Sequence, residues 1–404
     1  MSIFSVVIPA YNEEKGIAQI IQRVLAIQPE LKQAGISLEV LVIDDGSRDR
    51  TAEIACKMAE MNPEVRVISQ KNKGYGGALK TGFAQARGDV IGFLDADGTY
   101  PPEYFPQLIQ ELNRGVDLVI GSRMAGAKSQ MPVTRRVGNI FFASLLSLLG
   151  WQRITDSASG MRVFRREVLQ QIYPLPDGLN LTPVMSTRAI HEQIKMSEVA
   201  IPYSERVGRS KLSIFRDGWV FLESIVWTVL AYNPVQVLGI AGLIHLGLAA
   251  IIIAGLVVAR LSGITTIGPW GVAALFAAMI AAIIGISLFA LGVASNYLVS
   301  LFYRRPIRQG LFGAPIFKNP LENHFGWIGA VILTLGLALA AVSLVLGIQG
   351  WEIARIWLYL LGSTMGILFG VQLMIYWLLL RVLRELSKRD DLAAKDMNGS
   401  LIHP

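Results

Sequence analysis

Cysteine and charged residues are both scarce in this sequence of 404 residues, and each scarcity excludes a class of protein. Cys56 is the only cysteine, which excludes an internal disulfide framework and a metal cluster held by several thiolates. Charged residues make up 17% of the chain against 52% hydrophobic residues, a balance too apolar for an ordinary soluble protein. The N-terminus lacks a basic segment followed by a long apolar one, so we expect no signal peptide.

The charge that is present has a positive excess, with a formal net charge of +7. Such an excess suits nucleic acid, an anionic membrane surface or substrates that carry phosphate. No nucleic-acid-binding motif accompanies it, and the long apolar runs gather in the C-terminal half. We therefore expect a lipid bilayer and a phosphate-bearing substrate as partners, and no nucleic acid.

Four segments of the C-terminal half carry no Asp, Glu, Lys or Arg over a length that can cross a bilayer, which takes about 20 residues. They are Val235–Ala259, Gly271–Tyr303, Gly326–Gly347 and Trp357–Leu380. The pattern predicts a soluble domain over 1–212, a juxtamembrane helix over 213–234 and a transmembrane domain of four helices over 235–383. The remaining residues, 384–404, are expected to form a cytoplasmic tail.

Basic residues are distributed unevenly between these segments. Lys and Arg are frequent from Arg304 to Lys318 and from Arg381 to Lys395, and they are rare around Arg260 and Glu352. Because loops rich in Lys and Arg stay on the cytoplasmic side, we expect the first two regions in the cytoplasm together with the N-terminal domain. The chain is thus predicted to be a multi-pass protein of the inner or plasma membrane.

Two features inside the predicted spans have more than one interpretation. Gly362, Gly366 and Gly370 repeat every four residues, so they either bring another helix close, within the bundle or in a homo-oligomer, or are incidental. His245 lies inside the first span, where ionisable groups are often functional. A neutral histidine that is hydrogen-bonded between helices is the simpler interpretation.

Two apolar stretches outside the spans contain or follow charged residues. One extends from Ser213 to Tyr232, and the other from Ile140 to Trp151, directly after Arg135 and Arg136. Both fit helices that lie in the headgroup layer and hold the soluble domain against the membrane. The second stretch fits burial in the soluble core equally well.

The N-terminal half alternates short β-rich runs with helical patterns, which predicts an α/β fold with a mostly parallel sheet. The expected strands are 4–9, 38–43, 65–69, 90–94 and 118–120, and the expected helices are 13–27, 51–61, 76–86 and 102–113. Ligands of such sheets gather at the carboxyl ends of the strands. The polar residues that stand at those ends are Tyr11, Glu13, Asp44, Asp45, Asp95 and Asp97.

The triplet Asp95-Ala96-Asp97 follows an apolar strand. Two carboxylates one residue apart can bind Mg²⁺ or Mn²⁺, which holds a diphosphate and neutralises its growing charge as it leaves. Many Asp-x-Asp pairs are only solvated turn residues, but two repelling carboxylates at the end of a buried strand need a cation to offset them. We therefore predict a Mg²⁺ or Mn²⁺ site at Asp95 and Asp97.

Five segments occur in an order that is typical of one enzyme family. They are Ser5–Glu14, Val42–Thr51, Asn72–Asp89, Phe93–Glu103 and Gly121–Arg123. Together they resemble the family-2 inverting glycosyltransferases, which implies the GT-A fold, a Rossmann-like α/β domain. Arg135-Arg136, Asp156–Arg162 and Arg206–Leu212 narrow the likeness to dolichol-phosphate mannose synthase and its bacterial polyprenyl-phosphate relatives.

The resemblance implies a role for each matching residue. The donor, a nucleotide-sugar of the UDP-glucose or GDP-mannose class, would be bound by Pro9, Tyr11, Glu13, Asp44, Asp45, Ala96, Arg206 and Lys211. The catalytic residues would be Asp95, Asp97 and Arg123, with the metal on Asp95 and Asp97. The phosphate of a polyisoprenyl lipid acceptor would be bound by Arg123, Arg135, Arg136, Asn139 and Arg162. The sequence departs from several mannose synthases at Thr99, where they carry glutamine.

The clustered arginines also fit this acceptor on chemical grounds. A lipid phosphate is anionic at neutral pH and attacks the anomeric carbon without a general base, but it needs cations to place it beside another anion. A sugar-hydroxyl acceptor would instead require a catalytic carboxylate. We therefore predict transfer of a hexose from a nucleotide-sugar to a polyisoprenyl phosphate.

Three other functions match the residues less well. A processive polysaccharide synthase of this family would carry a QxxRW motif, and no segment of the sequence does. A glycosyltransferase for another lipid would not need the clustered arginines. A membrane carrier or scaffold with an inactive transferase domain would not need intact Asp95, Asp97 and Arg123.

Overall fold

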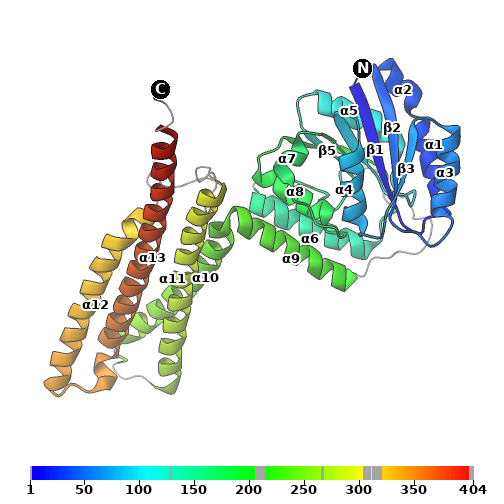
Figure 1. Ribbon diagram of the computed structural model, residues 1–404. Coiled ribbons are helices and arrows are strands. Elements are labelled where there is room, and N and C mark those ends of the chain that lie inside the picture. Colours follow the sequence, from blue (N-terminus) through cyan, green and yellow to red (C-terminus); the bar gives the residue numbers. More distant parts are fainter. Residues whose placement is uncertain are drawn as a thin grey trace. The chain divides into compact units, whose positions relative to one another are not determined.

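The computed structural model describes residues 2–126, 130–150, 152–204, 214–264, 268–303, 311 and 321–399. They belong to two compact units, Met1–Val229 and Leu230–Pro404 (Figure 1). The first unit is an α/β domain, and the second consists of long helices.

A mixed sheet forms the centre of the first unit. Its strands are β1 Ser2–Ala10, β2 Ile36–Asp44, β3 Val65–Ser69, β4 Val90–Phe93, β5 Leu118–Ser122, β6 Arg162–Arg165 and β7 Met196–Ala200. They are arranged in the order β3-β2-β1-β4-β6-β5-β7. Only β6 runs antiparallel to its neighbours in this seven-stranded sheet of the described residues. The predicted α/β fold with a mostly parallel sheet is confirmed, whereas β6 and β7 are absent from the predicted strands.

Helices cover both faces of this sheet (Figure 1). Those on one face are α1 Ile17–Leu25, α2 Gln28–Gln33, α3 Thr51–Met61 and α5 Phe105–Asn113, which follows a short 3₁₀ turn, η1 Pro102–Tyr104. Those on the other face are α4 Tyr75–Gln85, α7 Val168–Ile172 and α8 Leu181–His191. Along β1, Val6 and Ile8 enter the first core and Val7 enters the second, because successive side chains of a strand point to opposite faces. The central strands are buried on both sides, which explains their nearly continuous apolar sequences.

Two further helices of the first unit, α6 Val133–Gly150 and α9 Ile214–Tyr232, lie side by side (Figure 1). The rings of Phe142 on α6 and Phe221 on α9 join them, with centroids 5.9 Å apart. This contact fixes the position of α9 along α6.

Each of these helices also exposes large apolar side chains. On α6, Leu146 is buried while Phe141 and Leu148 are exposed, so the helix takes part in the core and still keeps an apolar outer face. On α9, Trp219 and Trp227 are both about two-thirds exposed, at 67% and 65%. Solvent-exposed tryptophans on a helix suit the interfacial layer of a membrane, so contact with a bilayer stays our prediction for both helices.

The second unit contains four helices long and apolar enough to cross a membrane. They are α10 Pro234–Leu261, α11 Pro269–Tyr303, α12 Phe325–Ile348, preceded by a 3₁₀ turn, η2 Leu321–His324, and α13 Ile353–Gly399, whose apolar part is Arg355–Leu386. The four predicted spans are therefore confirmed as helices. Their length and composition mark the chain as a membrane protein.

Glycines bring these helices together in two antiparallel pairs. A Cβ atom on Gly242 of α10 would lie 2.7 Å from the carbonyl oxygen of Gly285 on α11. A Cβ atom on Gly336 of α12 would lie 2.8 Å from the carbonyl carbon of Gly366 on α13, and Gly370 approaches α12 just as closely. The glycine repeat of the last span thus serves a helix contact within the bundle, which was one of its two interpretations.

His245 lies on α10, and its Nδ1 atom is 2.8 Å from the carbonyl oxygen of Ala241. Because the carbonyl can only accept, Nδ1 carries the proton in this contact. The expected bond between helices is wrong for this nitrogen: its partner is the previous turn of the same helix.

Candidate active site

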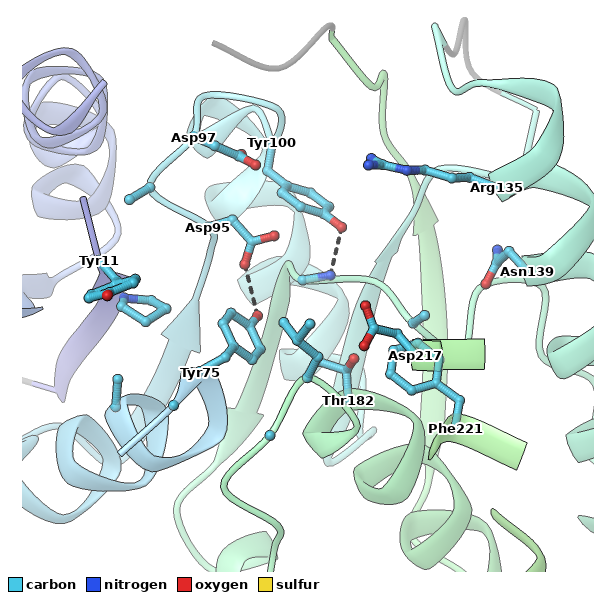
Figure 2. Close-up of a pocket in the computed structure, with 18 of the residues that line it drawn as sticks. Tyr11, Tyr75, Asp95, Asp97, Tyr100, Arg135, Asn139, Thr182, Asp217 and Phe221 are labelled. Carbon is cyan, nitrogen blue, oxygen red and sulfur yellow. Dashed lines mark hydrogen bonds between the residues drawn. The ribbon is translucent and has the colours of Figure 1, made fainter. Parts of the chain in front are cut away.

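A cavity of about 530 Å³ opens in the first unit at the carboxyl ends of its central strands (Figure 2). The predicted donor residues Pro9, Tyr11 and Glu13 reach it from the end of β1, and Asp45 from the end of β2. The segment after β4 contributes Asp95, Ala96 and Asp97. This is the edge at which α/β sheets bind their ligands.

Asp44 and Asp45 are neighbours in sequence but occupy different places. Asp45 lines the cavity, and its carboxylate accepts hydrogen bonds from the amide of Gln70 at 2.6 Å and from the backbone N–H groups of Lys73 and Gly74 at 2.8 and 2.9 Å. Asp44 is not part of the cavity wall and accepts a bond from the backbone of Ser47 at 3.2 Å. The structure thus brings Asp45 to the site, while Asp44 shapes the turn behind it.

The two carboxylates of the Asp-x-Asp triplet are held by neighbouring side chains. Tyr75, at the start of α4, donates its hydroxyl to Oδ1 of Asp95 at 2.8 Å (Figure 2). Thr99 donates both its backbone N–H and its hydroxyl to Oδ1 of Asp97, at 3.1 and 2.6 Å. These hydrogen bonds orient both carboxylates, and Thr99, the departure from several mannose synthases, is one of the groups that orient them.

Space beside Asp95 depends on a glycine. A Cβ atom on Gly160 would lie 2.7 and 2.8 Å from the two carboxylate oxygens of Asp95, closer than any side chain can approach. The backbone N–H of Gly160 in turn donates to the hydroxyl of Tyr100 at 2.7 Å. Gly160 thus leaves the front of Asp95 open toward the cavity.

Tyr75 is suited to remain a hydrogen-bond donor. Burial of the phenol, together with the negative charge of Asp95, raises the pKa of Tyr75 well above its ordinary value. The hydroxyl is therefore protonated throughout the physiological range, and Asp95 keeps its donor.

Arg123 lines the cavity from the end of β5, and its guanidinium is held by one carboxylate and two aromatic rings. Its Nε and Nη2 atoms both donate to the carboxylate of Asp156, each at 2.7 Å. Its guanidinium also lies over the rings of Tyr100 and Tyr203, 5.6 and 5.4 Å from their centroids. Such a fork-to-carboxylate pair between aromatic rings fixes the cation firmly at the cavity wall.

Arg123 and Asp156 each stabilise the charged form of the other, although both side chains are buried. Burial alone would lower the pKa of Arg123, but Asp156 and Tyr100 raise it well above its ordinary value. For Asp156, burial would raise the pKa, and the charge and hydrogen bonds of Arg123 outweigh it, so the pKa lies below the usual range. The carboxylate of Glu198 on β7 accepts the backbone N–H groups of Thr155 and Asp156 at 2.9 and 3.0 Å and thereby holds the loop that carries Asp156.

The predicted phosphate-binding arginines of α6 separate in the structure. Arg135 lines the cavity (Figure 2), whereas Arg136 is exposed and is not part of its wall. Successive helical side chains differ by about 100° in direction, so the two arginines leave α6 in different directions. Asn139, one turn after Arg135, does line it. Binding of an acceptor phosphate by Arg135 and Arg136 stays a prediction, and of this pair the cavity wall includes Arg135 alone.

Arg162 lies behind the cavity wall instead of in it. It is fully buried and donates to the carbonyl oxygens of Ser159 and Ser157, at 3.2 and 2.8 Å. Burial lowers its pKa to about 10, which still leaves it charged at neutral pH. Arg162 thus supports the backbone loop that contains Gly160, and its contact with an acceptor phosphate stays a prediction.

Several residues of the wall are missing from the sequence-based prediction. They are Asn72, Tyr75, Tyr100, Thr182, Tyr203, Asp217 and Phe221. Asp217 is the most unusual of them, a carboxylate on a helix that the sequence marks as membrane-facing. Its helical spacing from Phe221 and Ser224 was a signal that one face of this helix packs inward. The predicted donor residues Arg206 and Lys211 lie outside the described residues.

Comparison with known proteins agrees with this architecture. The profile of glycosyl transferase family 2 matches residues 5–173, and that of a domain of unknown function matches 234–394. The chain is 36% identical to a dolichyl-phosphate hexose transferase of Haloferax volcanii over 55% of this chain and 92% of that protein. It is 31% identical to an undecaprenyl-phosphate 4-deoxy-4-formamido-L-arabinose transferase of Pseudomonas aeruginosa over 60% of this chain and 69% of that protein.

Among solved structures, glucosyl-3-phosphoglycerate synthase from Mycobacterium tuberculosis, in complex with Mn²⁺, UDP and phosphoglyceric acid, matches with a TM-score of 0.45. The match has 24% sequence identity and covers 57% of this chain and 78% of that one. The motifs, the mixed sheet with its cavity at the strand ends, and the relatives lead to one assignment. The chain is a glycosyltransferase of family 2, with a GT-A domain followed by membrane-spanning helices.

Proposed function

We propose that this enzyme transfers a hexose from a nucleotide-sugar to the phosphate of a polyisoprenyl lipid, with inversion at the anomeric carbon. One observation carries the proposal: Asp95 and Asp97 share a single cavity with the cations Arg123 and Arg135. Two carboxylates suit a metal-bound donor diphosphate, and the arginines suit a second anion beside it. The names of the two curated relatives, both transferases for polyprenyl phosphates, support the same acceptor.

The residues present fit a divalent cation at the Asp-x-Asp triplet. Tyr75 and Thr99 each occupy Oδ1 of one carboxylate, and Gly160 keeps the space in front of Asp95 clear. No cluster of three or more His, Cys, Asp or Glu side chains suited to a metal occurs among the described residues, so two protein carboxylates would hold the ion. Mg²⁺ is commonly held in this way, by one or two carboxylates together with water and substrate phosphates. When bound, Mg²⁺ or Mn²⁺ neutralises the charge that develops on the leaving diphosphate.

The nucleoside of the donor would lie against the ends of β1 and β2. Pro9, Tyr11, Glu13 and Asp45 form this part of the wall. Asp45 already holds the loop of Lys73 and Gly74 in place, so the wall is ordered before a ligand arrives. A site ordered in advance loses less entropy when it binds its donor.

The acceptor phosphate would be bound by Arg123 and Arg135. Both line the cavity, Arg123 from the end of β5 and Arg135 from the first turn of α6. A phosphate oxygen then attacks the anomeric carbon, the bond to the nucleoside diphosphate breaks, and no proton has to be removed. A single displacement of this kind inverts the configuration at that carbon.

We further propose that the protein lies in the inner or plasma membrane with its GT-A domain and its C-terminal tail on the cytoplasmic side. The support is the high content of Lys and Arg from 304 to 318 and from 381 to 395. The first of these regions lies outside the described residues except for residue 311. Reporter fusions after Arg308 and after Lys388 should both report a cytoplasmic location, and an external location for both would refute this orientation.

The function is tested with the purified full chain, UDP-glucose or GDP-mannose, and a polyprenyl phosphate. We expect a polyprenyl-phosphate hexose product that requires Mg²⁺ or Mn²⁺ and disappears with EDTA, and no product when a polyprenol replaces the phosphate. Arg135→Ala should reduce use of the acceptor about tenfold to a hundredfold, the value of a charge-assisted contact, with the exposed Arg136→Ala as its matched control.

Four results would contradict the proposal. Equal transfer to the polyprenol would refute the phosphate as nucleophile, and polymer formation would indicate a polysaccharide synthase instead. Full activity in EDTA would refute the metal at Asp95 and Asp97. A larger acceptor defect in Arg136→Ala than in Arg135→Ala would return the phosphate site to the outer face of α6.

A further inference from the structure

The two carboxylates of the Asp-x-Asp triplet receive hydrogen bonds from different parts of the chain. Thr99 follows Asp97 by two residues and donates both its backbone N–H and its hydroxyl to that carboxylate, so the turn itself orients Asp97. Tyr75 donates its hydroxyl to Oδ1 of Asp95 at 2.8 Å from the first turn of α4 (Figure 2). The orientation of Asp95 therefore depends on a helix residue that lies 20 positions earlier in the sequence.

Hydrogen bonds to Asp45 hold the chain directly before Tyr75. The carboxylate of Asp45 accepts the backbone N–H groups of Lys73 and Gly74, at 2.8 and 2.9 Å. Gly74 has a φ of 88°, in the left-handed region that favours glycine, and it begins the turn into α4. The residues that lead into Tyr75 are thus fixed to the residue that follows β2.

The backbone of Pro176 and Asp177 holds the chain directly after Tyr75. A Cβ atom on Gly76 would lie 2.2 Å from the carbonyl oxygen of Pro176, so only glycine lets the two backbones pack this closely. The N–H of Gly77 donates to the carbonyl oxygen of Asp177 at 3.1 Å. Tyr75 therefore stands on a short stretch of backbone that is held from both sides.

The ring and the hydroxyl of Tyr75 have different surroundings. The ring packs against the apolar core on the α4 side of the sheet, where a phenylalanine would serve equally well. The hydroxyl lies at the cavity wall and donates to Asp95. Packing accounts for the ring alone, so the hydrogen bond to Asp95 is what requires a tyrosine at this place.

A carboxylate that binds a cation gains from being held in place. Asp95 and Asp97 repel each other without a cation, and this repulsion favours rotation of the Asp95 side chain away from its neighbour. The hydrogen bond from Tyr75 opposes that rotation, so less orientational entropy is lost when a cation binds. Groups that orient a metal ligand in this way typically change the affinity for the metal about tenfold to a hundredfold.

We propose that Tyr75 is the positioning residue of the metal site: its hydroxyl holds Asp95 in the orientation that binds Mg²⁺ or Mn²⁺ and thereby sets the affinity for the cation. The inference rests on the proposed function, which places the metal at Asp95 and Asp97. Tyr75 acts on the cation only through Asp95. Loss of the hydroxyl should therefore weaken metal binding and leave the transfer step intact once the metal is saturating.

The test measures Mn²⁺ binding to the full chain in nanodiscs of phosphatidylcholine, whose zwitterionic headgroups bind little of the ion. Binding is followed by the loss of the electron paramagnetic resonance signal of free Mn²⁺, without nucleotide or acceptor. In Tyr75→Phe, which keeps the ring and removes only the hydroxyl, we expect the dissociation constant for Mn²⁺ to rise about tenfold to a hundredfold. The Mn²⁺ concentration for half-maximal hexose transfer should rise by the same factor, while the rate at saturating Mn²⁺ stays within about threefold of the wild type.

Tyr173→Phe is the matched control, because Tyr173 is 38% exposed and is not part of the cavity wall. It should bind Mn²⁺ like the wild type. Asp97→Asn removes a charged ligand and defines the background binding of the ion to the rest of the chain and to the lipid. A dissociation constant for Mn²⁺ in Tyr75→Phe that equals the wild-type value would overturn the inference, as would a loss of rate that saturating Mn²⁺ does not restore.

The same experiment separates the inference from the proposed function. A wild type that binds Mn²⁺ above the Asp97→Asn background but transfers no hexose to a polyprenyl phosphate would refute the proposed function. The effect of Tyr75→Phe on the dissociation constant would still decide the inference in that case. A wild type whose Mn²⁺ binding does not exceed the background would refute the metal site and the inference with it.

Discussion

The two units of this protein treat polar groups in their interiors in opposite ways. The first unit buries full charges, among them Arg162, Asp156 and Glu39. In the described part of the second unit, the buried polar side chains are all uncharged: Asn233, Gln236, Asn296, Ser343 and Ser363. Both interiors are otherwise apolar, so the two units differ in whether the polar side chains that they bury carry a charge.

The way in which these groups are satisfied explains the contrast. In the first unit, two of these buried charges meet partners far away in sequence: Asp156 pairs with Arg123, and Glu39 accepts from Ser5 and Arg66 at 2.6 and 2.7 Å. In the second unit, Ser343 donates to the carbonyl oxygen of Leu339 in the preceding turn. A helix in a bilayer can satisfy a hydroxyl by itself, but an ion there has no such local solution. Charge is thus buried where the sheet brings distant residues together, and the pair of Asp156 and Arg123 places one such charge in the wall of the site.

The largest effect is expected from breaking the buried pair of the first unit. Asp156→Ala leaves the guanidinium of Arg123 buried at 12% side-chain exposure without its carboxylate. We expect a loss of about 3–5 kcal/mol in the free energy of unfolding of this unit. The full chain is unfolded with urea in detergent micelles, and hydrogen exchange in β5 and β6 reports the unfolding of this unit. Asp117→Ala is the matched control, because its pair with Arg165 is long, at 3.7 Å, and exposed, and it should cost well under 1 kcal/mol.

The same pair should make the stability of this unit depend on pH. The pKa of Asp156 is lowered in the folded state, so its contribution is complete above the unfolded value of about 3.9 and is lost as the pH falls through the lower folded value. The difference in stability between wild type and Asp156→Ala should therefore be constant from pH 7 to 5 and shrink below about pH 4. A difference that grows as the pH falls would contradict the assignment of the charge to Asp156.

Sequence reasoning succeeded where a local pattern determines the outcome. Uncharged runs of more than 20 residues predict spans because a bilayer admits little else, and all four appear as helices. The strands β1 to β5 follow from apolar runs bounded by turn residues, and the residues at their ends then meet at one edge of the sheet. Asp95, Asp97 and Asp45 were found in this way.

The sequence did not predict features that depend on a strand's distant partners or on the face of a helix from which a side chain projects. β6 is only four residues long and includes two arginines, so its pairing with β4 and β5 left no local signal. Arg135 and Arg136 look equivalent in a motif, but only the helix α6 shows that they point in different directions. Asp217 lies on a helix that the sequence marks as membrane-facing, and its spacing from Phe221 and Ser224 indicates an inward face without telling that this face meets the cavity.

A smaller effect is expected in the second unit, where glycine contacts take the place of the buried charges. At Gly336, a Cβ atom would lie 2.6 Å from the backbone nitrogen of Ile367, so Gly336→Leu must force α12 and α13 apart. We expect it to cost about 1–3 kcal/mol, the usual range for overpacking. Gly347→Leu on the same helix is the matched control, because no heavy atom lies within 4 Å of its Cβ position, and the higher helix propensity of leucine should make it neutral or slightly stabilising.

Hydrogen exchange of α12 and α13 in detergent micelles measures both variants, with exchange in β1 and β2 as the internal reference. Faster exchange confined to α12 and α13 in Gly336→Leu alone would show that the glycine contact holds this helix pair together. Equal exchange in the two variants would mean that the glycines of α12 are incidental, and the contrast between charge pairing in one unit and glycine packing in the other would lose its second half.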